Sequence, residues 1–303
     1  MINHLHQQPS SPRRVVILGG SGFIGKTLAK RLRDAGTEVV ALSSSDLNLT
    51  ADDAPEKLAR QLQPTDALVF ASCLTPDKGK DIGTTMQNLA MGHHVATALE
   101  QSPVAHVIYI SSDAVYADDV SLASETAKCE PASLYGMGHL MRERMMETAA
   151  ASGDLPLFIL RASLVYGNDD THNSYGPNRF RRAAAEKGQI DLFGGGEETR
   201  DHIAIDDVCR LIEQALLHRS TGILNAATGV STSFFDVATL VAEFADGDVK
   251  VNCSQRRNPV THRKYDITNT LKAFPNFRFK TLREGVAECA KQAKQTGSLK
   301  AVA

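Results

Sequence analysis

Short apolar runs alternate with longer stretches of helical periodicity over the first half of the chain. The runs predict buried strands at residues 15–17, 39–42, 67–71, 106–110 and 157–160. Helical patterns follow at 26–32, 54–62, 84–99 and 134–151. Strands that alternate with helices in this way are usually joined by right-handed crossovers. The pattern therefore predicts an α/β fold with a doubly wound parallel sheet.

Three glycines lie where the first strand gives way to the first helix, at Gly19, Gly22 and Gly25. In a dinucleotide site, one such glycine allows the tight turn, one lets the backbone approach the pyrophosphate, and one lets the helix pack closely on the strand. The N-terminus of the helix then directs free N–H groups at the phosphates. The alternative is an ordinary glycine-rich turn, but the place between strand and helix favours a Rossmann nucleotide site.

The alternating pattern ends after Gly167. A polar loop follows at 168–176, a glycine turn at 194–196, and the later apolar segments are shorter and interrupted by Pro259 and Pro275. We expect a smaller C-terminal substrate-binding lobe that covers the open edge of the cofactor site. The predicted organisation is a disordered tail at 1–13, a Rossmann domain at 14–167 with roughly 200–227, and the lobe at roughly 168–199 and 228–303.

Composition narrows the function classes. The chain has 303 residues, of which 42% are hydrophobic, so it can bury a large core. A net charge of −2 gives no reason to expect nucleic acid or an anionic membrane as partner, and no apolar run has the length of a membrane span. Five scattered cysteines without a C-x-x-C pair favour the cytoplasm and argue against a structural metal site. His4 and His6 are a weak alternative for metal binding, because a disordered tail explains them better.

A serine and a tyrosine follow two neighbouring elements of the predicted sheet. Ser112 comes at the end of the strand 106–110, and Tyr135 lies at the start of the helix 134–151. Ligands of a doubly wound sheet bind beyond the carboxyl ends of its strands. A tyrosine beside a serine hydroxyl can transfer a proton to or from a substrate oxygen if its pKa is lowered.

With these residues in place, the chain resembles the extended short-chain dehydrogenase/reductase family of nucleotide-sugar epimerases, dehydratases and reductases. The resemblance covers almost the whole sequence. It rests on five segments: Gly19-x-x-Gly22-x-x-Gly25, Ser111-Ser-Asp-Ala-Val-Tyr116, Tyr135-Gly136, Arg200-Asp-His-Ile-Ala-Ile-Asp-Asp-Val208 and Leu224-Asn-Ala-Ala-Thr-Gly229. Together these segments are specific for the family, though not for one reaction.

The resemblance implies a role for each matching residue. Ser112 would orient the substrate hydroxyl or ketone, and Tyr135 would act as acid/base. The implied cofactor-binding residues are Gly19, Gly22, Phe23, Ile24, Gly25, Ser43, Asp46, Leu47, Ala71, Asn88, Tyr135 and His139. The implied substrate-binding residues are Asp113, Asn173, Arg179, Arg200 and Arg263. The alternatives are a surface ion pair for Arg200, a helix-surface position for Asn88, and a basic loop against the C-terminal lobe for the loop 172–179 and Arg263.

Position 139 departs from the family pattern Tyr-x-x-x-Lys, since this chain has histidine there. In the family, the lysine binds the nicotinamide ribose and its charge lowers the pKa of the tyrosine. Tyr135 and His139 still share a helix face, but a histidine is mostly neutral at pH 7. Three interpretations stay open: His139 replaces the lysine in a working enzyme, the enzyme is slow or specialised, or catalysis is lost while cofactor binding persists.

Two further positions bear on specificity. The second strand ends in Ser43-Ser44-Ser45 rather than in an acidic residue. The absence of a carboxylate there slightly favours NADP over NAD as the cofactor. Asp46 and Leu47 are placed to reach the adenine. Asp113 is followed by Ala114, whereas the dehydratase branch of the family has Asp then Glu, so epimerisation or ketone reduction is favoured over 4,6-dehydration.

The sequence thus predicts a cytoplasmic NAD(P)-dependent epimerase or ketoreductase that acts on a nucleotide-activated sugar. A non-catalytic NAD(P)-binding sensor or scaffold on the same fold is the alternative. We also expect a homodimer through the helices 84–99 and 134–151, because the second carries Met137, Met141 and Met145, more apolar surface than one sheet-facing stripe needs. The alternative is that these methionines fill the core of the monomer.

Overall fold

A seven-stranded sheet forms the centre of the computed structural model, which describes residues 1–256 and 259–296. The strand order is β1-β11-β7-β5-β4-β2-β3, and every pair is parallel except β1 with β11. The strands are β1 (Asn3–His4), β2 (Arg14–Leu18), β3 (Glu38–Leu42), β4 (Asp66–Phe70), β5 (His106–Ser112), β7 (Leu157–Ala162) and β11 (Ser220–Ala226). From β2 the chain passes first to β3 on one side and then to β4 on the other. This reversal creates the crevice in which doubly wound sheets bind ligands.

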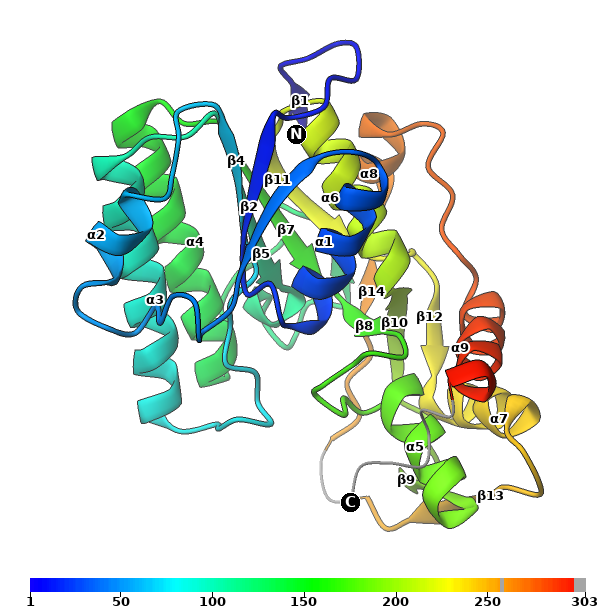
Figure 1. Ribbon diagram of the computed structural model, residues 1–303. Helices are drawn as coiled ribbons and strands as arrows, with labels where there is room; N and C mark the ends of the chain where they lie inside the picture. Colours follow the sequence, from blue (N-terminus) through cyan, green and yellow to red (C-terminus); the bar gives the residue numbers. More distant parts are fainter. Residues whose placement is uncertain (257–258, 297–303) are drawn as a thin grey trace.

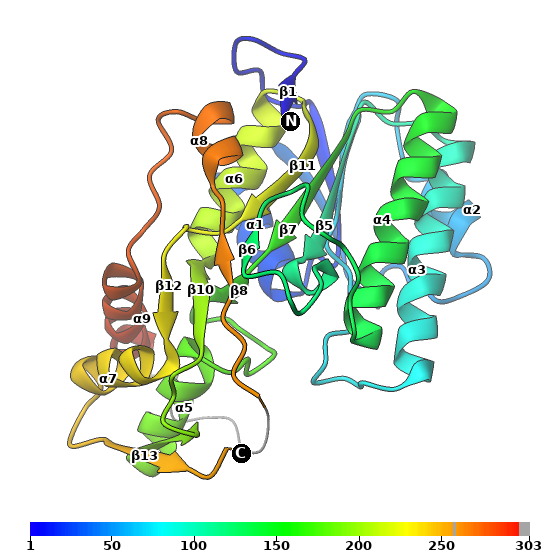
Figure 2. The same ribbon diagram turned by 180° about the vertical axis from the view of Figure 1, so that it is seen from behind.

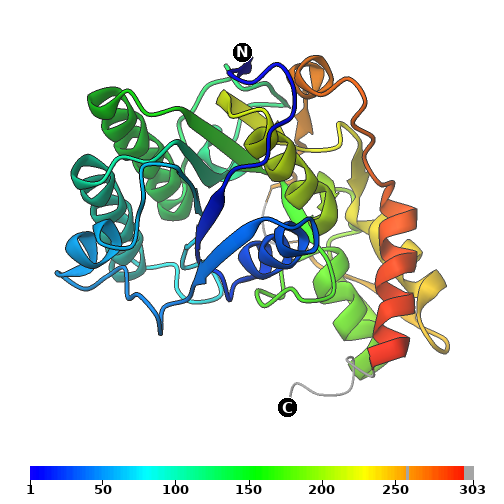
Figure 3. The same ribbon diagram turned by 45° about the horizontal axis from the view of Figure 1, so that its top comes forward.

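Helices cover both faces of this sheet, which confirms the predicted doubly wound α/β fold (Figure 1). One layer holds α2 (Ala54–Ala59), α3 (Ile82–Gln101) and α4 (Leu134–Gly153), and the other holds α1 (Phe23–Asp34) and α6 (Ile205–Leu217). Two separate apolar cores result, because the strands are buried on both faces. The view from above in Figure 3 shows the sheet between these layers.

The N-terminal segment 1–13, predicted as a disordered tail, carries a strand in this structure. Asn3–His4 adds an antiparallel strand to β11. Beyond it, the N–H of His6 donates to the carbonyl of His218, and the side chain of His4 contacts Ser220 Oγ at 2.8 Å. These bonds hold a polar segment that has little apolar surface of its own to bury.

The remaining elements lie mostly beyond the carboxyl ends of the central strands (Figure 2). Three small sheets have the orders β12-β10-β8, β13-β9 and β14-β6. The strands are β6 (Leu122–Ala123), β8 (Leu164–Tyr166), β9 (Gln189–Phe193), β10 (Thr199–Ala204), β12 (Ser231–Ser233), β13 (Lys250–Ser254) and β14 (Lys264–Tyr265). The helices are α5 (Pro177–Lys187), α7 (Phe234–Phe244), α8 (Thr268–Ala273) and α9 (Leu282–Thr296), with a 3₁₀ turn at Asp113–Val115.

This region has an apolar core of its own, in which Phe180, Ile190 and Phe234 are buried. It therefore packs as a unit beside the crevice rather than as loops draped over the sheet. None of the described helices combines the length and apolarity that crossing a bilayer requires.

Candidate active site

The glycine loop between β2 and α1 is shaped to receive a phosphate group. A Cβ on Gly25 would lie 2.1 Å from the carbonyl oxygen of Gly19, so only glycine lets the first turn of α1 pack on the loop. No side chain caps α1 at Gly22, whereas α3 and α4 are capped by Asp81 and Ser133. The N–H groups of the first turn of α1 therefore remain for an external anion, which fits the pyrophosphate of a dinucleotide.

One cavity of about 850 Å³ extends from this loop across the carboxyl ends of β2, β4 and β5. It is large enough for a dinucleotide together with part of a second ligand. Twelve of the sequence-predicted site residues line it: Gly19, Gly22, Phe23, Ile24, Gly25, Ser43, Leu47, Ala71, Ser112, Asp113, Tyr135 and His139.

At the end of β3, Asp46 folds back onto the strand instead of lining the cavity. Its carboxylate accepts hydrogen bonds from the N–H of Ser43 at 2.9 Å and from the Ser43 hydroxyl at 2.5 Å. These bonds lower the pKa of Asp46 below its usual value, the hydroxyl having the larger effect. The Asp46 carboxylate therefore lies beside the end of β3, although the residues that directly follow this strand are serines.

Asn88 is buried rather than exposed on the surface of α3. Its side-chain amide accepts from the N–H of Leu74 at 2.8 Å and donates to the carbonyl of the same residue at 2.9 Å. The pair of bonds fixes the loop that follows β4. This loop lines the cavity through residues 71–78. Asn88 therefore supports the cavity wall without lining the cavity itself.

Ser112 and Tyr135 meet at the cavity, as the order of the elements predicted. Gly136 makes this possible, because a Cβ there would lie 2.1 Å from the carbonyl oxygen of Ala114. The start of α4 can therefore approach the end of β5 closely. Burial raises the pKa of Tyr135 well above 10, with Cys73, Tyr109 and Asp113 adding to the rise, and a hydrogen bond from Ser112 opposes it.

His139 lies one turn beyond Tyr135 and is buried against it, with the ring centroids 4.7 Å apart. Both of its nitrogens already have protein partners: Nδ1 lies 2.8 Å from the hydroxyl of Tyr109, and Nε2 lies 3.5 Å from the sulfur of Cys73. Burial, with a smaller contribution from Arg142, lowers the pKa of His139 to about 3. The imidazole is therefore neutral at physiological pH and does not provide the positive charge of the lysine that the resemblance implies for this position.

Cys73, Tyr109 and Arg142 belong to this site but were missed from the sequence. Each reaches His139 from a different place: the loop after β4, the middle of β5, and the next turn of α4. No local motif marks any of them, because the contacts form only when β4, β5 and α4 come together. Tyr265 was missed for the same reason; its hydroxyl donates to the carboxylate of Asp113 from β14.

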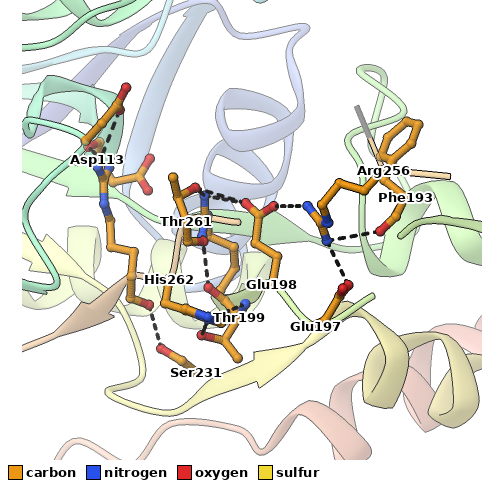
Figure 4. Close-up of polar contacts among 12 residues, drawn as sticks. Asp113, Phe193, Glu197, Glu198, Thr199, Ser231, Arg256, Thr261 and His262 are labelled. Atoms are coloured by element: carbon orange, nitrogen blue, oxygen red, sulfur yellow. Dashed lines mark hydrogen bonds and ion pairs between the residues drawn. The ribbon is translucent and has the colours of Figure 1, made fainter. Parts of the chain in front are cut away.

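A second, smaller cavity of about 180 Å³ adjoins Asp113 and contains Arg200 and Arg263. Arg200 forms an ion pair with Glu198 at 2.5 Å and donates to Thr261 Oγ1 at 2.7 Å. Arg263 donates to the carbonyls of Asp113 at 3.0 Å and Ala117 at 2.9 Å. Figure 4 shows Glu198 between Thr261 and Arg256, so one carboxylate serves more than one arginine.

The structure does not bring Asn173 or Arg179 to either cavity. Asn173 is exposed and accepts a hydrogen bond from Arg182, and the guanidinium of Arg179 lies 5.7 Å from the ring of Tyr175. Their neighbour His172 lines the main cavity instead, with Nδ1 2.9 Å from Thr75 Oγ1. This bond joins the loop after β4 to the loop after β8 at the rim of the cavity.

The fold and this site define an enzyme of the extended short-chain dehydrogenase/reductase type, with a glycine cradle, a serine–tyrosine pair and a C-terminal region beside them. The chain belongs to the NAD-dependent epimerase/dehydratase family, whose model matches residues 15–227.

Known proteins of this kind align with nearly the whole chain. A dTDP-L-rhamnose 4-epimerase of Burkholderia thailandensis is 24% identical over 322 residues, which cover 86% of this chain and 89% of the relative. The structure of MoeE5 in complex with UDP-glucose and NAD superposes with a TM-score of 0.80 at 25% identity, over 94% of this chain and 100% of that one. The UDP-glucose 4-epimerase of Thermotoga maritima with UDP-glucose also gives a TM-score of 0.80, at 20% identity over 93% and 99% of the two chains.

Proposed function

We propose that this protein is an NAD(P)-dependent epimerase or ketoreductase that acts on a nucleotide-activated sugar. One observation carries the proposal: a single cavity joins the glycine cradle to Ser112 and Tyr135 and continues to the loop at 170–174. A cofactor in the cradle and a sugar beside Tyr135 would therefore occupy adjoining parts of one space. The rhamnose epimerase and the UDP-glucose complexes among its relatives support a nucleotide sugar as the substrate class.

In this mechanism Tyr135 exchanges a proton with the sugar oxygen and Ser112 holds that oxygen in place. A bound nicotinamide supplies the chemistry for hydride transfer at the sugar carbon. The high pKa of Tyr135 keeps its phenol protonated in the free protein, which suits proton donation to a ketone oxygen. Removal of a proton from a sugar hydroxyl needs the phenolate, and hence a positive charge nearby.

The substrate's nucleotide end would lie towards Arg200 and Arg263. Guanidinium groups bind diphosphates well, because their fork of N–H donors matches phosphate oxygens. Arg200 is held by Glu198 in this structure, so a diphosphate would have to replace that carboxylate.

We keep Asp113 as a substrate contact and regard Asn173 and Arg179 as contacts that need a movement of the loop 172–179. On this proposal, residues 168–199 and 228–303 form the substrate-binding lobe.

For the cofactor we now favour NAD over NADP. The Asp46 carboxylate lies beside the N–H of Ser43 at the end of β3, where it would repel a 2′-phosphate and accept from ribose hydroxyls. Titration calorimetry of wild type and Asp46→Asn with both dinucleotides tests this choice. Tighter binding of NADP by wild type would restore the preference predicted from the serine run.

The proposed activity is tested by nicotinamide absorbance and product analysis with a panel of nucleotide sugars. Tyr135→Phe should lower kcat by about 10³-fold while cofactor affinity stays within a factor of about three. Ser112→Ala should lower kcat less, because it removes one hydrogen bond and leaves the acid/base in place. Wild-type turnover that survives Tyr135→Phe would contradict the role given to Tyr135.

One observation favours the alternative, a sensor that binds NAD(P) without catalysis. Neutral His139 has both nitrogens engaged by Tyr109 and Cys73, so it neither carries the family lysine's charge nor offers a free donor to a ribose. Cofactor binding without turnover of any nucleotide sugar would support the sensor.

We further propose a homodimer through α3 and α4 and a location in the cytoplasm. Ile82, Met86, Met137 and Met141 of these helices are all about half exposed or more, and the two helices lie side by side at the outside of the molecule (Figure 1). Apolar side chains gathered on one surface are typical of an interface. The five cysteines are free thiols, as expected in a reducing compartment.

A further inference from the structure

Arg142 is the largest fully buried side chain among the residues that the structure describes, with 1% of its surface exposed. Its Nη2 donates to the carbonyl of Ser72 at 2.6 Å, and the guanidinium also interacts with the thiol of Cys73, while Nε and Nη1 make no hydrogen bond. The neighbouring carboxylate, Glu143, is paired with Arg161 at 2.7 Å instead. Within residues 1–256 and 259–296, no ion pair joins Arg142 to a carboxylate. A buried guanidinium without a counter-ion is expensive, so its position calls for an explanation.

The surroundings of Arg142 are built to hold a cation. The guanidinium carbon lies 4.3 Å from the ring centre of Phe70 and 5.2 Å from that of Tyr109. Gly92 of α3 leaves room for the side chain, because a Cβ there would lie 2.8 Å from Arg142 Cγ. Two aromatic faces and a missing side chain therefore accommodate a charge that no acid neutralises.

This charge is linked to the proposed proton-transfer group through two intervening rings. The ring of Tyr109, which faces Arg142, carries the hydroxyl that contacts His139 Nδ1, and the rings of His139 and Tyr135 pack in a T-shaped arrangement. Burial raises the pKa values of Cys73 and Tyr109, and Arg142 opposes both rises. The field of Arg142 thus reaches the groups that surround Tyr135.

We propose that Arg142 supplies the fixed positive charge that relatives place at position 139, so that the cation has moved three residues along α4 and into the core. The inference rests on the proposed role of Tyr135. When Tyr135 acts as base, the O–H bond of the sugar hydroxyl breaks and the phenol O–H forms, and Arg142 stabilises the phenolate before that step. Arg142 touches no reacting atom and is a positioning residue whose effect on Tyr135 is electrostatic.

The other ionisable groups near this pair do not provide such a charge. Cys73 from the loop after β4, Tyr109 from β5 and Asp113 from the 3₁₀ turn all raise the pKa of Tyr135. On α4, His139 is neutral and Glu143 is committed to Arg161. The side of α3 that meets Arg142 presents Gly92. A guanidinium stays protonated at every pH at which proteins remain folded, so it can serve where His139 cannot.

The test reads the phenol of residue 135 directly. A fluorinated tyrosine, whose phenol is more acidic than that of tyrosine, is placed at position 135 of the full chain and its ionisation is followed by ¹⁹F NMR. Arg142→Met should raise the midpoint by about one pH unit, a tenfold change in the ionisation constant. Arg142→Lys should recover most of that shift. His139→Lys combined with Arg142→Met returns the charge to the family position and should also lower the midpoint again.

A parallel measurement follows the rising limb of kcat against pH, which should move with the midpoint while cofactor affinity stays unchanged. Equal midpoints in wild type and Arg142→Met, or no ionisation in either before unfolding, overturn the proposal. If Arg142→Met does not fold, Arg142→Lys with the wild-type midpoint and Arg142→Gln with a raised one support it, and equal midpoints in these two overturn it. If no variant turns over a nucleotide sugar, the proposed function fails, yet the NMR midpoints still decide the role of Arg142.

Discussion

The β2–α1 loop and the first turns of α4 line the same cavity but are built in different ways. The shape of the loop is determined by its backbone. Its residues are small, the N-terminus of α1 has no side-chain cap, and Gly25 packs closely against Gly19. The face of α4 works through side chains whose properties come from elsewhere. His139 is neutral because it is buried, with a smaller contribution from Arg142, and its contacts Tyr109 and Cys73 come from β5 and the loop after β4.

This contrast explains why the two regions tolerate change differently. The conformation of the glycine loop is determined by steric contacts of its backbone. A larger side chain at one of these glycines is therefore either accommodated without change or displaces the loop. The environment of a buried side chain can be rearranged while its function is kept, for example by moving a charge from one turn of a helix to the next. The departure that the family resemblance implies accordingly falls on α4, at position 139, and not in the glycine loop.

Among substitutions that change cofactor affinity, the largest effect should come from a methyl group in the loop. In Gly25→Ala the new Cβ would lie 2.1 Å from a backbone oxygen, so α1 must move and we expect cofactor binding to weaken by about 100-fold, or roughly 2.7 kcal/mol. Gly22→Ala has its nearest contact at 3.3 Å and should weaken binding less, through the space that the pyrophosphate needs. Titration calorimetry measures both affinities.

Gly138→Ala is the matched control on α4, since its Cβ would meet only the Thr85 methyl, at 3.7 Å. It should bind cofactor normally and gain a little stability, because alanine favours helices over glycine by about 1 kcal/mol. Equal cofactor affinities for Gly25→Ala and Gly138→Ala would remove the distinction between the two regions.

The same contrast decides what could be predicted from the sequence. The sheet, its flanking helices and the meeting of Ser112 with Tyr135 were predictable, because apolar periodicity and the order of the elements determine them. The partners of His139 were not: Cys73 lies 66 residues away and carries no motif. Strand β1 was missed because backbone hydrogen bonds hold it, and these leave no pattern in a polar segment.

The outward face of α4 allows a second test. If the role of its side chains depends on what packs against them, as it does on the inward face, its exposed methionines should matter only through the proposed dimer contact. Met137 and Met141 are 47% and 50% exposed in the single chain. Burial of a methionine side chain contributes about 1.5–3 kcal/mol, so Met137→Glu with Met141→Glu should convert the proposed dimer to a monomer in light scattering at micromolar concentration.

Phe235→Glu is the control for this pair. Phe235 is similarly exposed, at 46%, but lies on α7 at the other side of the molecule (Figure 1), and the substitution should leave the mass unchanged. A wild-type protein that is already monomeric would instead show that the methionines are simply exposed.

A further effect, on the pH dependence of stability, comes from the inward face of α4. His139 has a pKa of about 3 in the folded protein and about 6.5 when unfolded. Between these values the unfolded chain binds a proton that the folded one does not, so the free energy of unfolding falls as the pH is lowered from 6.5, by about 1.4 kcal/mol per pH unit for this group. His139→Gln cannot take up that proton and should flatten the decline between pH 6 and 4 in urea titrations. Above pH 7.5 both proteins bind no proton at this position in either state, so their slopes should agree there. Parallel curves from pH 4 to 8 would mean that His139 takes up its proton equally in both states, and that burial does not lower its pKa in the folded protein.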